Sequence, residues 1–213
     1  HDLDFATSAT PDQIEKLVSP LAQAVWDVGR EYGTIACQIG EDTFEITTYR
    51  SDLYDGASRK PLVAFGSSLE ADLERRDFTM NAMALTLPGL QLVDPFGGLE
   101  DLLAHTLRTP ISPEVSFGDD PLRMMRAARF SSQLGAEIDQ VTATAMADMA
   151  PRIADISAER VRDELVKILS SDSPRAGLEL LVESGIAEFV LPEFPALRLE
   201  ADKHAHHKDV YQH

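Results

Sequence analysis

The stretch that most constrains the fold opens the chain and reads His1-Asp2-Leu3-Asp4-Phe5-Ala6-Thr7. Its residues favour a β-strand, and residues two apart on a strand point to the same face. Asp2 and Asp4 would then present two carboxylates together, as a pair of divalent metal ions requires in phosphoryl transfer. By itself an Asp-x-Asp triplet is weak evidence, because most such pairs are solvated surface acids. The rest of the sequence has to decide between these interpretations.

Beyond this strand, helical and extended patterns alternate. Thr10-Pro11-Asp12 predicts a helix start, with Thr10 as N-cap and Pro11 in the first helical position. Residues 21–28 continue as a second helical pattern, which Gly33 ends. A β-hairpin is expected next, with strands over 34–39 and 43–49 and a turn at 40–42.

The middle of the chain mixes loop and short elements. Residues 51–68 are polar and rich in Gly and Ser, which predicts a long mobile loop of the kind that often carries function. A helix is expected from about Leu69, a short strand over 90–94 and a turn over 94–98.

The second half of the chain is different in character. From about residue 112 helical patterns dominate, and no further strand is expected. Helices are predicted from 118–121 onward and over about 139–149, 157–170 and 174–184. The predicted fold class is therefore α+β, a small mixed β-sheet followed by an all-α half.

Charge and composition restrict the functions that the chain can have. The formal net charge is −17, with 36 acidic residues against 19 Lys and Arg, which argues against unspecific binding to nucleic acid or an anionic membrane. No apolar run approaches the roughly 20 residues that span a bilayer, so no membrane partner is expected. Bound metals and local arginine clusters can nevertheless reverse the field at one site. The arginines cluster at 75–76, at 123, 126 and 129, and at 160 and 162.

Cys37 is the only cysteine, and its neighbours are apolar. It cannot form an internal disulfide, and we expect a buried thiol. A reducing cytoplasm fits this composition best.

The first arginine cluster opens the segment Arg75-Arg76-Asp77-Phe78-Thr79-Met80-Asn81-Ala82, which turns apolar and reads as helical. Cations at a helix start oppose the macrodipole by about 0.3–1 kcal/mol each, unless they meet phosphate. Asp77 and Asn81 are four apart and would share a helix face, where an acid and an amide suit a ribose or base edge. The alternative is that the arginines pair with nearby acids and that Asp77 caps the helix.

The second cluster follows Asp119-Asp120-Pro121, where Asp120 as N-cap and Pro121 in the first helical position predict a helix start. An aspartate and an arginine in fixed geometry offer acceptors and donors to a base edge, and further arginines could meet a triphosphate. The alternative is that Asp120 only caps and the arginines pair with acids of neighbouring helices. The arginines concerned are Arg123, Arg126 and Arg129, and a second row, Leu122, Met125 and Ala128, should face the core.

Two weaker candidates remain. Glu45 lies in the predicted strand over 44–50 and could supply a third carboxylate or a base, or be a solvated residue or a partner of Arg50. Four histidines near the C-terminal end are spaced like metal ligands, but they equally suit an exposed helix, and no second ligand cluster exists for them to join. They are His204, His206, His207 and His213.

Together these motifs resemble the bacterial class II tRNA nucleotidyltransferase and poly(A) polymerase family of the polymerase β-like superfamily. Their residues look most similar to those of CCA-adding enzymes of actinobacterial type. The resemblance covers nearly the whole chain and runs through six motifs in the right order. They lie at 2–7, 44–50, 75–82, 94–98, 117–123 and 156–160. The resemblance implies template-independent addition of CCA to the 3′ end of tRNA from CTP and ATP.

The resemblance also implies a domain organisation. Residues 1–108 would form the nucleotidyltransferase head without its N-terminal part, because the glycine-rich segment that precedes the first aspartate in the family is not in the sequence, and His1 stands where many members have serine. Residues 109–170 would form a helical neck that binds nucleotide and RNA. Residues 171–213 would form a helical body that leads into an HD-like segment.

Roles for single residues follow from the same resemblance. Asp2 and Asp4 would bind two Mg²⁺ ions. Arg76 and Asp77 would contact the incoming nucleotide, with Asp77 at the ribose 2′-hydroxyl. Glu45 and Asn81 stay candidates from their positions alone, Glu45 for catalysis and Asn81 for nucleotide binding. Asp120 and Arg123 would read the Watson–Crick edge of CTP or ATP, and Arg126 and Arg129 would bind the triphosphate. Residues 51–68 match a loop that helps the family switch from C to A addition.

Other functions stay open at this point. A poly(A) polymerase shares every motif quoted, and a phosphohydrolase with its activity in the HD-like segment is a second possibility. A non-enzymatic RNA-binding module fits the acidic charge less well. The sequence does not indicate an oligomeric state.

Overall fold

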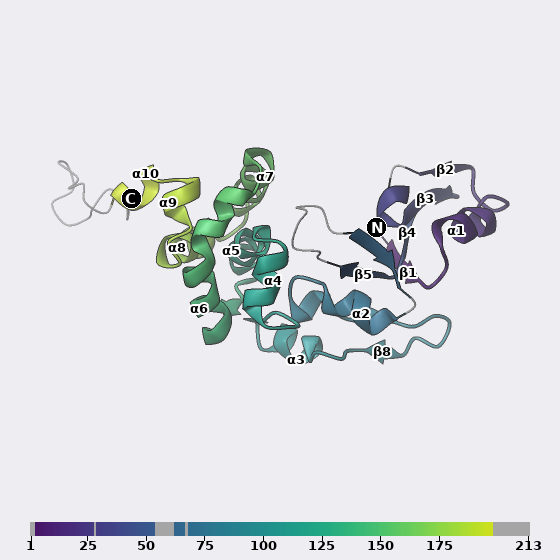
Figure 1. Cartoon of the computed structure of the whole chain (residues 1–213), viewed down its shortest axis with the longest axis horizontal. Coiled ribbons are helices and arrows are strands. Elements are labelled where there is room, and N and C mark those ends of the chain that lie inside the picture. Colours follow the sequence, from purple (N-terminus) through teal and green to yellow (C-terminus); the bar gives the residue numbers. More distant parts are fainter. Residues whose placement is uncertain (1–2, 28, 54–61, 67, 198–213) are drawn as a thin grey trace. The chain divides into compact units, whose positions relative to one another are not determined.

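The computed structural model of the chain describes residues 3–27, 29–53, 62–66 and 68–197 (Figure 1). The chain divides into two compact units, His1–Arg76 and Asp77–His213. Each unit has its own hydrophobic core. The α+β class predicted from the sequence is confirmed, since a small mixed sheet in the first unit is followed by a mainly helical second unit.

The first unit is built on a four-stranded sheet of order β1-β4-β3-β2. Strand β1 runs parallel to β4, whereas β3 is antiparallel to both of its neighbours. Gly40 (φ 66°) turns the chain between β3 and β4, as the predicted hairpin requires. The strands are β1 (Leu3–Thr7), β2 (Ala24–Trp26), β3 (Thr34–Ile39) and β4 (Asp42–Thr48).

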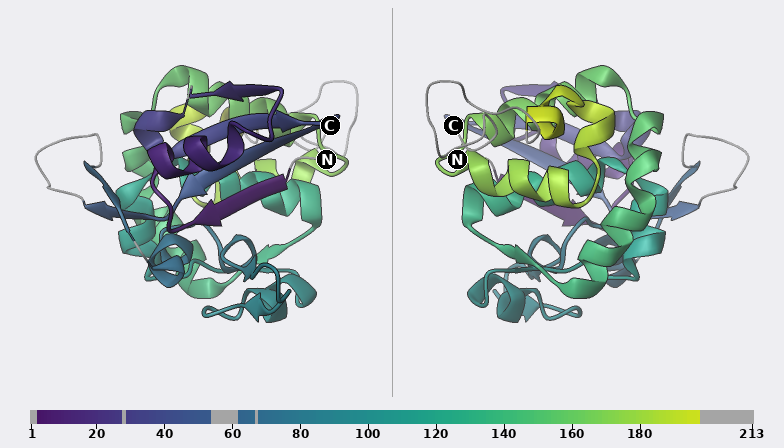
Figure 2. Two further views of the ribbon diagram at one scale, coloured as in Figure 1. Left: turned by 90° about the vertical axis from the view of Figure 1, so that its right-hand side faces the viewer. Right: turned by 90° about the vertical axis from the view of Figure 1, so that its left-hand side faces the viewer.

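Helix α1 (Pro11–Val18) covers one face of this sheet, in front of the strands in the left view of Figure 2. Its buried Ile14 and Val18 pack with Ile35 and Cys37 of β3. The helix starts where the sequence predicts, and the Gln13 side chain accepts a hydrogen bond from the Thr10 amide at 2.9 Å. Strand alternation leaves the opposite face of the sheet polar.

Two sequence predictions that concern strands of this unit are wrong. Residues 24–26 form strand β2 instead of continuing a helix, because their β-forming side chains complete the open edge of β3. The window 51–68 is not wholly a loop, since β5 (Arg50–Leu53) pairs with β6 (Leu62–Phe65) in an antiparallel ribbon. The window as a whole is polar, although it contains the apolar run Leu62-Val63-Ala64-Phe65 that forms β6. Residues 54–61 lie outside the described residues.

Helix α2 (Leu69–Glu74) ends the first unit and begins where the sequence predicts. Its N-cap Ser68 accepts a hydrogen bond from the Ala71 amide at 3.3 Å. The helix is short, and Arg75 is already its C-cap residue.

The second unit begins with short elements. The 3-10 turn η2 (Thr79–Asn81) precedes a ribbon of β7 (Ala84–Leu85) and β8 (Leu92–Val93), and α3 (Gly98–Leu103) follows. The strand predicted over 90–94 is therefore present as β8. A further pair, β9 (Thr106–Leu107) and β10 (Glu137–Ile138), places a strand where none was expected. Two residues are too few to give a periodic signal.

Helices make up the rest of the second unit. They are α4 (Pro113–Asp119), α5 (Leu122–Leu134), α6 (Gln140–Met149), the 3-10 segment η3 (Ala150–Asp155), α7 (Ala158–Leu169), α8 (Pro174–Glu183), α9 (Ala187–Val190) and α10 (Glu193–Ala196). Ser112, Asp139 and Ser157 cap α4, α6 and α7 with side-chain oxygens, which agrees with the predicted starts of the last two.

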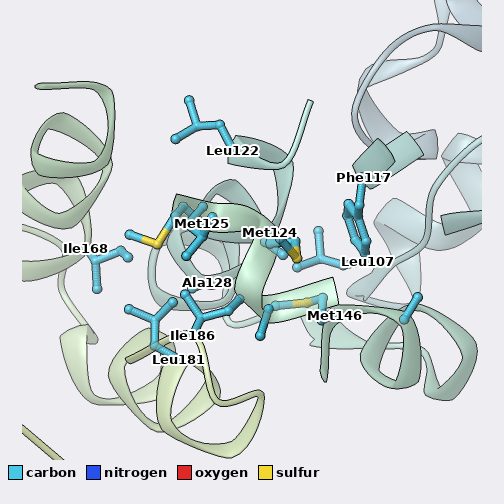
Figure 3. Packing of buried hydrophobic residues seen from close by; sticks show 14 of the residues in the cluster. Leu107, Phe117, Leu122, Met124, Met125, Ala128, Met146, Ile168, Leu181 and Ile186 are labelled. Atoms are coloured by element: carbon cyan, nitrogen blue, oxygen red, sulfur yellow. The ribbon is translucent and has the colours of Figure 1, made fainter. Parts of the chain in front are cut away.

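Helix α5 is the centre of the second core (Figure 3). The row predicted to face inward, Leu122, Met125 and Ala128, is buried. Met124 is also buried and belongs to the same cluster as Leu107 and Phe117, and further apolar side chains from α6, α7 and α8 complete it (Figure 3). Gly177 of α8 lets that helix approach α5 closely, and its amide donates to Ser132 Oγ at 2.9 Å. Of the helices in the described part of the chain, none has the length and apolarity to cross a bilayer.

Candidate active-site residues

Two carboxylates face solvent on the open side of the first sheet. Asp4 of β1 and Glu45 of β4 are register partners across the parallel pair, so their side chains share one face, and both residues are exposed. The next residues along these strands, Phe5 of β1 and Phe44 of β4, lie on the opposite face of the sheet, and their ring centres are 5.9 Å apart. Asp2, the other member of the predicted pair, lies outside the described residues.

This donor set suits a hard divalent cation. Carboxylate oxygens are the ligands that Mg²⁺, Ca²⁺ and Mn²⁺ prefer. Asp4 and Glu45 supply two such groups, and across residues 3–27, 29–53, 62–66 and 68–197 no cluster of three or more His, Cys, Asp or Glu side chains is found. The histidines at 204–213 lie beyond the described residues.

Arg75 and Arg76 lie at the end of α2, which corrects the prediction that they begin a helix. At a helix C-terminus a cation is favoured by the macrodipole, so their placement needs no phosphate. The buried Asp72 binds both, at 3.1 Å from Arg75 Nη2 and 3.4 Å from Arg76 Nη2, and accepts from the Arg50 amide at 3.1 Å. The pairing with a nearby acid, considered as the alternative, is therefore present.

Asp77 and Asn81 are brought together, although not on one face of an α-helix. Phe78 is extended (φ −132°, ψ 152°) and the 3-10 turn η2 follows. Asp77 is buried, and its Oδ1 accepts from the Phe78 amide at 2.9 Å and from Asn81 Nδ2 at 3.0 Å. Its Oδ2 lies 2.6 Å from Arg126 Nη2 of α5. Asp77 thus fixes the turn and ties it to α5.

A buried network that the sequence reading missed supports this turn. Asp101 of α3 accepts from Thr79 Oγ1 at 2.5 Å and from Arg108 Nε at 3.1 Å, and also pairs with Arg108 Nη2. Burial acts to raise the pKa of Asp101, but the hydrogen bonds and the charge of Arg108 outweigh it and lower the pKa below its usual value. Gly98 lies so close that a Cβ there would be 2.1 Å from the Thr79 carbonyl oxygen.

Asp120 occupies the junction between α4 and α5. The N-cap of α5 is Pro121, so the predicted start is one residue early, but the Asp120 carboxylate does serve the helix, because Oδ1 accepts from the Leu122 amide at 3.2 Å. Its Oδ2 lies 2.9 Å from Arg160 Nη2 of α7. Both carboxylate oxygens are therefore held within the second unit.

Arg123, the second residue of α5, is held by a residue of α4. The residue is only 8% exposed, and its Nη1 donates to Ser116 of α4, to Oγ at 2.8 Å and to the carbonyl oxygen at 3.3 Å. The Arg123 amide donates to the Asp120 carbonyl oxygen at 3.0 Å, and each of the two side chains has its partner in another helix.

Arg126 and Arg129 pair with acids outside α5. Arg126 contacts Asp77, and Arg129 Nε lies 2.9 Å from Glu164 Oε2 of α7. The guanidinium of Arg129 also lies 4.2 Å from the centre of the Phe130 ring. Burial lowers the pKa of Arg129, and the Glu164 charge offsets this only in part. The pairing with an acid of a neighbouring helix, considered as the alternative, is present for Arg129, whereas Arg126 pairs with an acid of the segment before η2.

Two further polar residues at this place, Ser116 and Arg160, were not among the predicted site residues. Ser116 gives no sequence signal, since it lies among the apolar residues of α4. Arg160 does give one, because it is the third residue of α7, where the macrodipole favours an acid.

The fold and the carboxylate face define the class of protein. The family described as "Poly A polymerase head domain" matches residues 1–108, and the one described as "Probable RNA and SrmB- binding site of polymerase A" matches residues 135–197. The chain belongs to the poly(A) polymerase and tRNA nucleotidyltransferase family, as its motifs predicted.

Curated relatives within that family include CCA-adding enzymes. The one from Bacillus subtilis is 42% identical over 194 residues, which cover 91% of this chain and 47% of that protein. The one from Lactobacillus helveticus is 40% identical over 195 residues, covering 91% and 47%. The chain spans about half the length of these relatives.

Solved structures of CCA-adding enzymes are also similar to this chain. The Bacillus stearothermophilus CCA-adding enzyme in complex with CTP has a TM-score of 0.77 at 39% identity, covering 87% of this chain and 44% of that one. The Thermotoga maritima CCA-adding enzyme complexed with tRNA-CCA has a TM-score of 0.74 at 26% identity, covering 91% and 44%.

Proposed function

We propose that this chain carries the catalytic part of a CCA-adding tRNA nucleotidyltransferase, which transfers CMP, CMP and AMP in turn from CTP and ATP to the 3′ end of tRNA. The observation that carries the proposal is the similarity, over about nine-tenths of the chain, to relatives named CCA-adding enzymes at 40–42% identity. Similar solved structures are complexes with CTP and with tRNA, which supports these substrates.

The carboxylate face is proposed as the metal site. Asp4 and Glu45, together with Asp2, which precedes Asp4 by two residues, would hold divalent cations, which we take to be Mg²⁺. Ions bound there supply activation of the RNA 3′-hydroxyl and stabilisation of the leaving pyrophosphate. The residues of the sheet keep the carboxylates on one face, because Asp4 and Glu45 are fixed by strand register and backed by the apolar core.

Asp120 and Arg123 are proposed to read the base. Cytosine and adenine each present an amino donor next to a ring-nitrogen acceptor, whereas uracil and guanine present a carbonyl acceptor next to a ring N–H donor. An ionised Asp only accepts hydrogen bonds and an Arg only donates them. A fixed Asp–Arg pair is therefore complementary to the first two bases and leaves unpaired groups against the other two, which is costly.

The remaining predicted residues keep their proposed roles at the nucleotide. Arg76, Asp77 and Asn81 are proposed to contact the incoming nucleotide, with Asp77 at the ribose 2′-hydroxyl, and Arg126 and Arg129 to bind the triphosphate. The ion pairs of Arg126 and Arg129 with Asp77 and Glu164 support a second role, which is to hold the turn and α7 against α5.

Replacing Asp4 tests the metal role. We expect Asp4→Ala to reduce incorporation of labelled CMP and AMP into tRNA lacking CCA to background, because a proposed metal-binding carboxylate is lost. The side chain removed is exposed, so the fold should not change. Asp42→Ala, also an exposed acid on β4, is the control and should keep wild-type incorporation. Wild-type turnover by Asp4→Ala, with an unchanged circular dichroism spectrum, would contradict the proposed site.

Nucleotide choice separates this function from the alternatives. The description of the matching head family favours a poly(A) polymerase as the second candidate. An enzyme of that kind adds AMP without limit and never incorporates CMP, whereas a CCA-adding enzyme stops after three nucleotides. A phosphohydrolase in the HD-like segment would instead remain active in Asp4→Ala.

A further inference from the structure

We propose that Arg160, which is not among the residues assigned to the nucleotide above, is a positioning residue that sets base specificity by holding the Asp120 carboxylate in one orientation. The inference deepens the proposed function and rests on it. Its basis is the ion pair between Arg160 Nη2 and Asp120 Oδ2, 2.9 Å long, which joins residues 40 positions apart in the sequence.

Asp120 needs such a partner because its backbone does not lie within a helix. The residue is extended (φ −142°, ψ 98°) at the C-terminal end of α4, just before Pro121, and is not part of the helical backbone of α4 or α5. One carboxylate oxygen is held by the Leu122 amide at 3.2 Å. That single contact leaves the carboxylate free to rotate about it, and Arg160 fixes the second oxygen and therefore the plane of the group.

The position of Arg160 in its own helix argues that the contact has a purpose other than building α7. Ser157 is the N-cap, and Arg160 is the third residue after it, where a cation opposes the macrodipole and an acid is preferred. The side chains of Arg160 and Asp120 are 52% and 30% exposed, and ion pairs of this exposure contribute little to stability. Arg160 therefore stands at a helix position that favours an acid, although its ion pair with Asp120 adds little stability. Departures from local preference of this kind are typical of functional sites.

The other base-reading candidate has an equivalent support. Ser116 of α4, fully buried, holds Arg123 Nη1 at 2.8 Å, as Arg160 of α7 holds Asp120. An acceptor and a donor each fixed from a separate helix present one invariant pattern to a base edge. Preorganisation of this kind is what allows a polar pair to reject a base with the reversed pattern.

Removing the Arg160 guanidinium should therefore reduce the preference for CTP over UTP more than it reduces the stability of the fold. Without Arg160, Asp120 can turn away from the amino group of cytosine, and a base with a carbonyl in that place meets less repulsion. Binding of CTP should weaken and binding of UTP should improve or stay the same. The quantity that reports the effect is the ratio of the Kd for UTP to the Kd for CTP.

The experiment measures this ratio on the full 213-residue chain with Mg²⁺, by competition against a fluorescent nucleotide. In R160M we expect the ratio to fall at least about tenfold, and in R160K to recover most of that loss, because a cation again faces Asp120. R162M is the matched control, since Arg162 lies on the same helix, is more exposed and pairs with its neighbour Asp163 at 2.8 Å. Its ratio should stay within about twofold of wild type.

A double mutant shows whether Arg160 acts through Asp120. D120N should lower the ratio by itself, and D120N/R160M should lower it no further, because the partner is already lost. A wild-type ratio in R160M, or equal losses in R160M and R162M, would overturn the positioning role. Additive losses in the double mutant would also overturn it. If D120N itself keeps the wild-type ratio, the base-reading role in the proposed function fails instead.

Discussion

At the scale of single residues, the carboxylate of Asp101 is the most informative group to test. It is buried, accepts from Thr79 and pairs with Arg108, which is 54% exposed. We expect Asp101→Asn to lower the free energy of unfolding at pH 7 by about 1–3 kcal/mol, because the amide cannot replace the charge-assisted bonds and the pair is partly solvated. Urea denaturation measures this difference.

The effect of Asp101→Asn should depend on pH in a defined direction. The pKa of Asp101 is lowered in the folded protein, so its stabilising contribution is complete above the unfolded value of about 4. The contribution is lost as the pH falls through the folded pKa. The difference between wild type and variant should therefore be constant from pH 7 to 5 and shrink at lower pH. A difference that grows on acidification would contradict the network.

Some residues of the candidate site could be predicted from the sequence, and others could not. Charged and amide side chains at helical spacing made four residues of the site predictable, namely Asp77, Asn81, Asp120 and Arg123. The side chains of Asp77 and Asn81 are hydrogen-bonded to each other, and the Arg123 amide donates to the Asp120 carbonyl oxygen. What the spacing could not give was the partner, because Arg160 and Ser116 come from helices that only the tertiary fold brings close. The glycine pair Gly97-Gly98 read as a turn, yet only Gly97 needs its positive φ of 73°.

At the scale of elements, the crossing of α5 and α8 depends on the absence of one side chain. A Cβ on Gly177 would lie 2.3 Å from Ser132 Oγ and 2.5 Å from the Ala128 carbonyl oxygen. We expect Gly177→Ala to destabilise the protein by about 1–3 kcal/mol, because the two helices have to move apart in a close-packed core. Chemical denaturation is the measurement.

Gly118 in α4 is the matched control for this substitution. A Cβ there would meet nothing within 4 Å, and its backbone is helical. Gly118→Ala should leave stability unchanged or raise it by up to about 1 kcal/mol. If both variants lost equal stability, steric crowding at the α5–α8 crossing would not be the cause.

Helices with a polar N-cap and a periodic row of apolar residues could be predicted. Short strands that form only by pairing with a neighbouring strand could not. Helices α1, α6, α7 and α8 lie where their polar N-caps and apolar rows predict. Strand β2 was taken for helix, because three residues cannot outweigh a helical window unless the edge of β3 is known. The ribbon of β5 and β6 escaped for a related reason, since its apolar half is short and lies beside a polar stretch.

At the scale of the whole molecule, the described residues contain two separate hydrophobic cores. Ile35 belongs to the first and is fully buried, whereas Met124 belongs to the second. We expect Ile35→Ala to cost about 2–5 kcal/mol and to reduce hydrogen-exchange protection in β1, β3, β4 and α1. Protection in α5 and α8 should change little.

The complementary variant Met124→Ala should show the reverse pattern, with protection lost mainly in α4, α5 and α6. Equal loss everywhere in both variants would argue for one cooperative unit. The three-part division into 1–108, 109–170 and 171–213 stays a prediction.

The buried position of Cys37 has a practical consequence. Its thiol is fully covered by the packing of α1 on β3, and burial raises its pKa, so little thiolate is available. A maleimide dye offered to the native protein should therefore find no reactive sulfur. Site-directed labelling can then use one cysteine introduced on the surface, without first replacing the natural one.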